Sequence, residues 1–307
     1  MFLTPAAKPM SAPSHQSDPL EIASLDPASD ISGWHGCLNL IYGSSNQHSQ
    51  IRQSYHQAPL NLQRPFYPEG PEVCHSVIMH TAGGMVSGDR LSMDIELQPQ
   101  AHALLTTAAA GKIYRSQGIE AQQTLQCRLA AGAVLEWLPL GTIVFEQARF
   151  RQTLRVELDP GAIYVGWEIT RLGRSARGEK FMQGDWRSQT EVWQQGTPLW
   201  IDRQWLPGQP EVWQSPHGLA GQPVVGSFIW VGRAVETDTV QAARHLWQQV
   251  APAQTAEVGV TRLQLGLICR YRGPSSQAAR QWFMQVWHLL RSTYLGRPAC
   301  PPRVWPL

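Results

Sequence analysis

The sequence predicts a mostly β fold with two helices in its C-terminal half. Short apolar runs separated by glycine, proline and aspartate recur from Ile31 onward, whereas the three-to-four spacing of a helix first becomes clear at Thr237. Strands that follow one another without intervening helices are typical of an all-β architecture and not of βαβ units. We therefore do not expect a doubly wound parallel sheet.

The expected strands are short, and turn residues separate them. In chain order they cover residues 34–42, 76–80, 91–97, 103–107, 121–129, 134–138, 142–145, 151–158, 163–170, 181–193, 199–203, 226–231 and 258–270. No repeat of fixed period and no interdomain linker interrupts them, so residues 31–307 are expected to form one domain. Residues 1–30 are rich in Pro, Ser, Ala and Asp without periodicity, and we expect a disordered tail there.

Residues 80–116 form the densest motif of the chain. Gly83, Gly84 and Gly88 mark a turn, because glycine adopts positive φ or permits close backbone approach at little cost. Residues 91–97 then alternate apolar and polar side chains, and residues 103–107 resume an extended pattern after an interruption at Pro99. The motif therefore predicts a glycine turn followed by a pair of strands.

Two late segments carry the helical signal. Residues 237–250 have three-to-four apolar spacing after a Thr-Asp-Thr sequence that can cap a helix. A second helix is expected to begin at Ser275 or Ser276 and to end before Gly296. Its apolar stripe comprises Ala279, Trp282, Phe283, Val286, Trp287, Leu290 and Tyr294. Both helices are expected to pack against the sheet.

Composition favours a protein partner over nucleic acid. The chain has 25 basic and 23 acidic side chains, a net charge of +2, and no clustered basic patch of the kind that binds DNA or RNA. Thirteen tryptophans and 43% hydrophobic residues, against 16% charged residues, indicate more apolar surface than a free monomer needs. Most of the tryptophans are nevertheless expected in the core.

The cysteines and the N-terminal sequence favour the cytoplasm. Five widely spaced cysteines without a C-x-x-C pair indicate neither a disulfide framework nor a structural zinc site, which fits a reducing compartment. The first twenty residues lack a signal-peptide pattern, and no run approaches the roughly 18 apolar residues of a membrane span. We expect a soluble cytoplasmic protein with no membrane contact.

The sequence contains no complete nucleotide-binding or hydrolytic motif. Gly83 and Gly88 have the spacing of the first half of a P-loop, but Asp89 and Arg90 stand where lysine and a hydroxyl residue are required. No G-x-G-x-x-G and no G-x-S-x-G sequence occurs. An independent hydrolase that uses Ser87, Thr106 or Thr107 with Lys112 stays open as the alternative function.

The histidines and cysteines near the central motif do not predict a tight metal site. In an extended segment Cys74 and His80 share a face about 20 Å apart, and His75 points to the other face. A site built from these residues and His102 is therefore not expected. Weak, transient binding by the carboxylates Asp89, Glu168 and Glu179 remains open.

Several blocks of the sequence together resemble the urease accessory protein UreD (UreH) family. The central ones are GG-x-x-x-GD-x-L at 83–91, LTT at 105–107 and K-x-YRS at 112–116. The outer ones, in the order of the family, are PFYPEG at 65–70, LEWLP at 135–139, I-x-F at 143–145, WE at 167–168, LGR-x-x-x-GE at 172–179 and PRVW at 302–305. The resemblance covers roughly residues 34–305.

The resemblance implies a maturation scaffold without a catalytic or nucleotide site of its own. Members of this family bind apo-urease on one side and, through the accessory protein UreF, the GTPase UreG on the other, so that Ni²⁺ reaches urease. The implied fold is an elongated, β-helix-like stack of strands with two helices, through which nickel can pass. No tightly bound cofactor is implied, only transient Ni²⁺. The tryptophan-rich C-terminal half, including the helix with Trp282, Phe283 and Trp287, suggests a surface that UreF or urease covers.

Within this resemblance, Asp89, Glu168 and Glu179 are the expected nickel-path carboxylates. Gly83, Gly84, Gly88, Thr106, Thr107, Lys112, Tyr114 and Arg115 form the expected structural motif. One departure occurs at Leu140 and Gly141, where the family usually has a polar pair that includes an acid. Glu136 and Glu146 are nearby alternatives.

Overall fold

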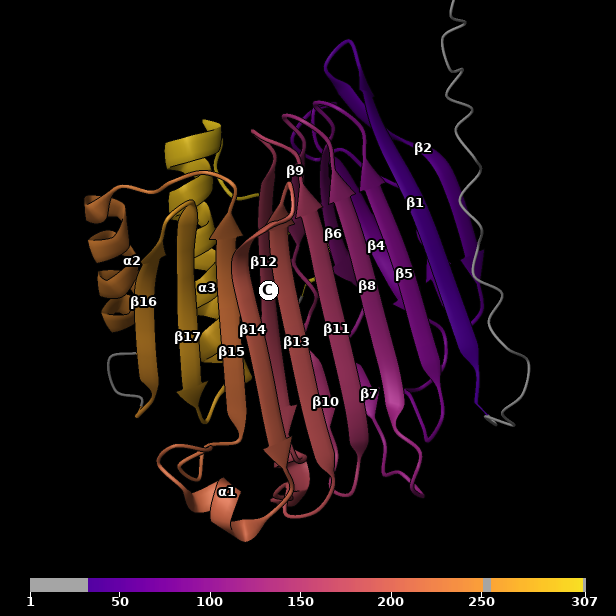
Figure 1. Ribbon diagram of the computed structural model, residues 1–307, viewed down its shortest axis with the longest axis vertical. Helices are drawn as coiled ribbons and strands as arrows, with labels where there is room; N and C mark the ends of the chain where they lie inside the picture. Colours follow the sequence, from indigo (N-terminus) through magenta and orange to yellow (C-terminus); the bar gives the residue numbers. More distant parts are fainter. Residues whose placement is uncertain (1–32, 251–254, 306–307) are drawn as a thin grey trace, which may run out of the picture. The chain divides into compact units, whose positions relative to one another are not determined.

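A computed structural model describes residues 33–250 and 255–305 (Figure 1). The expected disordered tail at residues 1–30 lies outside this range. The described chain is mostly β, as predicted, and its strands form two sheets. None of the described helices is both long and apolar enough to span a lipid bilayer.

Seven strands form the first sheet. They are β1 (His35–Ser45), β2 (His48–Gln57), β5 (Arg90–Leu97), β8 (Ala121–Leu129), β11 (Arg149–Leu158), β13 (Asp185–Gln194) and β14 (Thr197–Pro207), arranged in the order β14-β13-β11-β8-β5-β1-β2.

Ten strands form the second sheet. They are β3 (Leu60–Leu62), β4 (Cys74–His80), β6 (His102–Thr107), β7 (Gly111–Ile113), β9 (Val134–Trp137), β10 (Thr142–Val144), β12 (Ile163–Leu172), β15 (Val224–Val231), β16 (Glu257–Leu263) and β17 (Gly266–Gly273). The main path is β16-β17-β15-β12-β9-β6-β4-β3, with β10 between β12 and β7.

The central strands alternate between the two sheets as the chain proceeds. β4, β6, β9 and β12 run parallel in one sheet, and the intervening strands β5, β8, β11 and β13 run parallel in the other. Neighbouring turns present matching apolar residues to the interior: Leu40, Ile95, Cys127, Val156 and Val192 lie side by side across five strands, and all are buried. This winding confirms the β-helix-like stack.

The two strands expected after the glycine turn are present, but the prediction that they pair with each other is wrong. β5 and β6 both exist, but β5 pairs with β1 and β8, whereas β6 pairs with β4 and β9 in the other sheet. Gln98 to Ala101 turns the chain across from one sheet to the other. The apolar face of β5 was predicted correctly, since Leu91, Met93, Ile95 and Leu97 are buried.

Antiparallel hairpins complete both sheets. The single strand expected at 258–270 is a hairpin, β16 and β17, whose turn ends at Gly266 with φ of +155°. β2 was missed because most of its residues are polar and exposed. The strand expected at 181–193 begins only at Asp185, and the one expected at 199–203 extends over Thr197–Pro207.

The two predicted helices are present. α2 (Thr237–Val250) packs against β16, and α3 (Ser276–Leu290) packs against α2 and against β12, β15 and β17 (Figure 1). Ser275 caps α3, because its hydroxyl accepts a hydrogen bond from the N–H of Ala278 at 3.1 Å. A π-helical turn (Arg291–Leu295) continues α3; a 3₁₀ turn (Ser175–Arg177) and α1 (Pro210–Gln214) are the short additional elements.

The helix aromatics belong to a second core. One apolar cluster fills the space between the two sheets, and another lies between the ten-stranded sheet and the helices. Trp282, Phe283 and Trp287 are fully buried in the second cluster. The prediction that α3 packs its apolar stripe against the sheet is therefore confirmed, and these three side chains cannot themselves contact a partner.

A buried charge network fastens the end of α3 to the ten-stranded sheet. Arg291 and Glu136 are both 0% exposed, and their Nη2 and Oε1 atoms lie 3.2 Å apart. Glu136 also accepts hydrogen bonds from the Nε2 of His102, at 2.6 Å, and from the Nε1 of Trp287. Burial alone would raise the pKa of Glu136, but the charge of Arg291 and these hydrogen bonds outweigh it and lower the pKa to about 2.

We expect Glu136→Gln to lower the free energy of unfolding by about 3 kcal/mol at pH 7, because the buried charge of Arg291 then keeps only Glu69 as an acidic partner. The folded pKa lies below the ordinary value of 4.5, so the contribution of Glu136 is present above pH 4.5 and is lost as pH falls toward 2. Urea denaturation of both proteins across this range should show their difference shrinking. A difference that is constant with pH would contradict the assignment; Glu157→Gln, at an exposed pair, is the control.

Candidate functional site

Residues of both sheets line a cavity of about 410 Å³. Its wall includes residues from five strands of the first sheet (β5, β8, β11, β13 and β14) and from most strands of the second. The cavity therefore extends across successive turns of the winding, from the glycine motif beside β4 and β5 to β14, β15 and β17. Both sheets supply its lining.

The glycine motif closes one end of this cavity. Gly84 has a φ of +151°, and a Cβ at this position would lie 2.5 Å from the ring of Tyr114 and 2.6 Å from the carbonyl oxygen of Lys112. The N–H of Met85 donates to that same carbonyl at 2.8 Å, and the hydroxyl of Tyr114 donates to the carbonyl of Gly83 at 3.1 Å. Gly84 thus allows the loop to press against β7, and both segments line the cavity.

The hydroxyl groups of the motif hold neighbouring segments in place. Thr106 is buried; its hydroxyl donates to the carbonyl of Leu138 at 2.6 Å and accepts from the Nε1 of Trp305 at 2.8 Å. Thr107 accepts from the N–H of Leu140 at 3.0 Å. These bonds join β6 to the segment after β9 and to the end of the described chain.

The nucleophile and base of the hydrolase alternative are not assembled. Ser87 lies 3.0 Å from the hydroxyl of Ser116 and donates to the carbonyl of Ile119 at 2.9 Å. Lys112 and Arg115 are exposed, and among the described residues no hydrogen bond joins Lys112 to Ser87, Thr106 or Thr107. The geometry gives this alternative no support.

The structure places Asp89 and Glu179 in backbone-binding positions. The carboxylate of Asp89 accepts the N–H of Trp34 at 2.9 Å and that of Val86 at 2.8 Å, which fixes the glycine turn. Glu179 accepts the N–H of Glu146 at 2.6 Å and pairs with Arg174. Neither residue lines the cavity.

Glu168 differs from these two, because its carboxylate faces the cavity. On β12 the side chains of Val165, Trp167 and Ile169 belong to the core beneath the helices, so strand alternation directs Glu168 to the opposite face, between the sheets. Its Oε2 accepts from the hydroxyl of Ser188 at 2.9 Å, and its Oε1 accepts from Thr170 at 3.2 Å. Within the described residues no cationic side chain pairs with it.

Burial, above all, raises the pKa of Glu168, and the negative charge of Asp202 raises it further; hydrogen bonds from Ser188 and Thr170 act in the opposite direction. The side chain is half-buried and lines the hollow. An uncompensated carboxylate in such a position attracts a cation strongly, since the low local dielectric weakens screening.

Asp202 is a second cavity carboxylate, which the sequence reasoning missed. Its Oδ2 accepts from the Nη1 of Arg270 at 2.7 Å and from the Nε2 of Gln204 at 2.8 Å. Arg270 also donates to the hydroxyl of Ser227 at 2.6 Å. Asp202 lines a second pocket as well, of about 430 Å³, so that it lies in the wall between the two hollows.

The sequence of β14, the strand of Asp202, places polar residues between apolar ones, and this pattern could have identified Asp202 as a candidate inward-facing residue. On β14 the apolar side chains Ile201 and Trp205 are exposed, and the intervening Asp202 and Gln204 are turned inward. A strand with polar residues at alternate positions between apolar ones can have either face buried. Only the neighbouring strands decide which, and here they select the polar face.

The departure at Leu140 and Gly141 lies at the cavity wall. Gly141 has a φ of +103°, lines the cavity, and its added Cβ would approach the carbonyl oxygen of Ile169 to 2.8 Å. The nearby acids do not replace a carboxylate there. Glu136 is bound in the buried network, and Glu146 accepts the N–H of Met182 at 2.7 Å.

The family model described as "UreD urease accessory protein" matches residues 35–306. The chain belongs to this family. It is 74% identical over 283 residues to the "Urease accessory protein UreD" of Acaryochloris marina (strain MBIC 11017), which covers 92% of this chain and 99% of the relative.

More distant family members match over similar lengths. The protein of the same name from Nostoc sp. (strain PCC 7120 / SAG 25.82 / UTEX 2576) is 58% identical and covers 90% of this chain and 97% of the relative. The one from Synechocystis sp. (strain ATCC 27184 / PCC 6803 / Kazusa) is 41% identical over 82% of this chain and 93% of the relative. The UreD family resemblance inferred from the sequence blocks is confirmed.

We expect Glu168→Gln to raise the free energy of unfolding by about 0.5–2 kcal/mol at pH 7.5, because it removes a half-buried charge that has no cationic partner among the described residues. The folded pKa of Glu168 is raised, so the wild-type protein loses stability as pH rises from the ordinary value of 4.5 through the folded pKa. The variant lacks this loss. Urea denaturation at pH 4.5 and 7.5 should show an advantage of the variant that grows with pH.

Glu179→Gln serves as the contrasting change, since it weakens an ion pair and should destabilise the protein. A Glu168→Gln protein that is less stable than wild type at pH 7.5 would contradict the assignment of Glu168 as an uncompensated cavity carboxylate.

Proposed function

We propose that this chain is a scaffold of urease maturation through which nickel passes on its way to the urease active site. Membership in the UreD family supports the coarser part of this proposal, a role in urease maturation. The observation that carries the finer part is the carboxylate of Glu168, which faces the intersheet cavity without a cationic partner among the described residues.

The chemistry of the cavity suits a passing cation. Carboxylate and hydroxyl oxygens bind Ni²⁺ less firmly than thiolate sulfur does, so an ion held by them exchanges readily. Glu168 offers its charge with only neutral donors around it, and Asp202 offers a charge that Arg270 partly offsets. An ion can thus bind at Glu168 and leave toward Asp202 without being trapped in a deep free-energy minimum.

The proposed path continues through Asp202 into the second pocket. Asp202 lines both hollows, and the second one also contains Glu257, a largely exposed acid at the start of β16. The path that we propose therefore uses Glu168 and Asp202. Asp89 and Glu179, proposed from sequence alone, contribute by fixing the loops in which they lie.

We further propose that the chain binds UreF, through it the GTPase UreG, and apo-urease. Exposed aromatic side chains support a partner-binding role in place of the buried helix aromatics: Trp34 is 64% exposed, Trp205 is 62% exposed and Tyr55 is 52% exposed. The nucleotide chemistry in this scheme belongs to UreG, consistent with the absence of phosphate-binding motifs in the sequence.

Glu168→Gln and Asp202→Asn should lower the nickel content of urease several-fold while binding to UreF, UreG and urease is retained. The reason is that each change removes a negative charge from the cavity with little change in volume. Apo-urease would be matured with each variant and a full set of accessory proteins, and its nickel would be measured by elemental mass spectrometry. Co-elution of the complex is measured on the same samples.

Asp94→Asn is the matched control, because Asp94 is an acid on an exposed surface paired with Arg128. It should leave nickel loading unchanged. Normal nickel in urease matured with both cavity variants would refute the path. Loss of nickel together with loss of co-elution would instead assign the effect to complex assembly and also contradict the role given to Glu168.

A further inference from the structure

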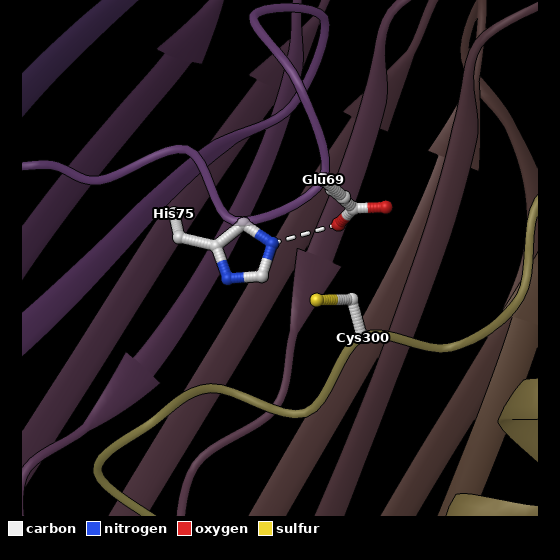
Figure 2. A group of neighbouring side chains, drawn as sticks. All are labelled: Glu69, His75 and Cys300. Carbon is white, nitrogen blue, oxygen red and sulfur yellow. Dashed lines mark hydrogen bonds and ion pairs between the residues drawn. The ribbon is translucent and has the colours of Figure 1, made fainter.

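Glu69, His75 and Cys300 form a compact cluster away from the cavity (Figure 2). The possible ligand atoms of the three side chains, a carboxylate oxygen, a ring nitrogen and the thiol sulfur, all lie within 4.8 Å of one another. Cys74 belongs to the core between the sheets, so the next residue along β4, His75, lies on the opposite face of the ten-stranded sheet. The three residues come from β4, the loop before it and the C-terminal segment.

The cluster is held in place from several sides. The ring of His75 is fully buried, and its Nε2 lies 2.7 Å from the Oε1 of Glu69. Before Cys300, the N–H of Ala299 donates to the Nδ1 of His288 at 3.3 Å, and the carbonyl of Pro298 accepts from Arg291 at 2.7 Å.

Beyond Cys300, the guanidinium of Arg303 lies 4.9 Å from the centre of the Phe66 ring, and Trp305 donates to Thr106. The segment that carries the thiol is therefore fixed at both ends, which places the sulfur near Glu69 and His75 without a large ordering cost on binding.

From this geometry we infer that Glu69, His75 and Cys300 bind one divalent transition ion of the Zn²⁺ or Ni²⁺ class. Imidazole nitrogen, carboxylate oxygen and thiolate sulfur are the donors that these ions take. Bonds of about 2.0–2.3 Å in a tetrahedral site separate ligand atoms by roughly 3.5 Å, so side-chain shifts of about 1 Å complete the site. A water molecule takes the fourth position, and binding releases the thiol proton of Cys300 to solvent. The proton that Nε2 of His75 shares with Glu69 moves to Nδ1, so that the neutral ring binds the ion through Nε2.

The surroundings make this an exchangeable site and not a structural one. Arg291 pairs with Glu69 at 2.9 Å, and Arg297 lies 3.6 Å from the same carboxylate, so two positive charges oppose the ion. The Nδ1 of His75 is buried and has no hydrogen-bond partner among the described residues, whereas tight sites usually provide an acceptor there. Loss of that acceptor alone costs about 10–100-fold in affinity.

The inference is independent of the proposed nickel path. None of the three residues lines the intersheet cavity, and they lie on the other face of the sheet from Glu168. An ion here would cross-link the C-terminal segment to the loop before β4. It would thereby stabilise the fold, whether or not the cavity conducts nickel.

The test uses the full chain after treatment with a chelator, incubated with Zn²⁺ or Ni²⁺ in separate arms. Alkylation of Cys300 by iodoacetamide, followed by peptide mass spectrometry, should slow at least about tenfold with the ion that binds. Cys37, the other partly exposed cysteine, is the internal control and should react at an unchanged rate. The melting temperature should rise by about 3–8 °C at a hundredfold excess over Kd.

Cys300→Ala should bind about one ion fewer per chain in equilibrium dialysis, and Cys37→Ala should bind as wild type does. The single variant Glu69→Gln, whose folding is checked by circular dichroism, should bind the ion with an affinity about tenfold or more below that of wild type. Unchanged alkylation of Cys300 with both ions, or equal stoichiometry in Cys300→Ala and wild type, would overturn the inference. Neither readout depends on urease, so failure of the nickel path leaves the test intact.

Discussion

The structure depends on one constraint: after each central strand the chain crosses to the opposite sheet. When it returns, the new strand pairs in parallel with the previous strand of the same sheet. Inward side chains of successive turns therefore stack along each sheet, as the row through Leu40, Ile95 and Val156 of the first sheet shows, and the inward faces of both sheets share one core. Where the inward residues are apolar they form a core. Glu168, Asp202 and Ser227 stand among these inward residues and line a hollow whose wall is otherwise mainly apolar.

Two carboxylates on the ten-stranded sheet, Glu136 and Glu168, illustrate how partners decide the role of a charge. Glu136 lies on the helix side, where Arg291, His102 and Trp287 surround it, and its pKa is lowered. Glu168 lies on the cavity side with only neutral donors, and its pKa is raised. The first acid stabilises the fold by joining helix and sheet. The second is expected to reduce stability, and we propose that it binds a passing cation.

Local sequence patterns predicted most of the strands and helices, and sequence blocks predicted the family, but they predicted few of the residues of the candidate site. Alternation in β5 and the apolar stripe of α3 identified buried faces, because those signals lie within a few residues. Strand pairing did not follow, since the four-residue connection after Leu97 permits either a hairpin or a crossing. Glu168 was proposed from sequence, whereas Asp202 and Cys300 are brought into their clusters by contacts between distant segments.

The most direct test of the account is the position of nickel itself. Crystals of the full chain, soaked in Ni²⁺ and measured at the nickel absorption edge, should show anomalous density between the sheets within bonding distance of Glu168, and this density should vanish in Glu168→Gln. Nickel density found only outside the cavity, with the carboxylate of Glu168 still bound to Ser188 and Thr170 alone, would contradict it.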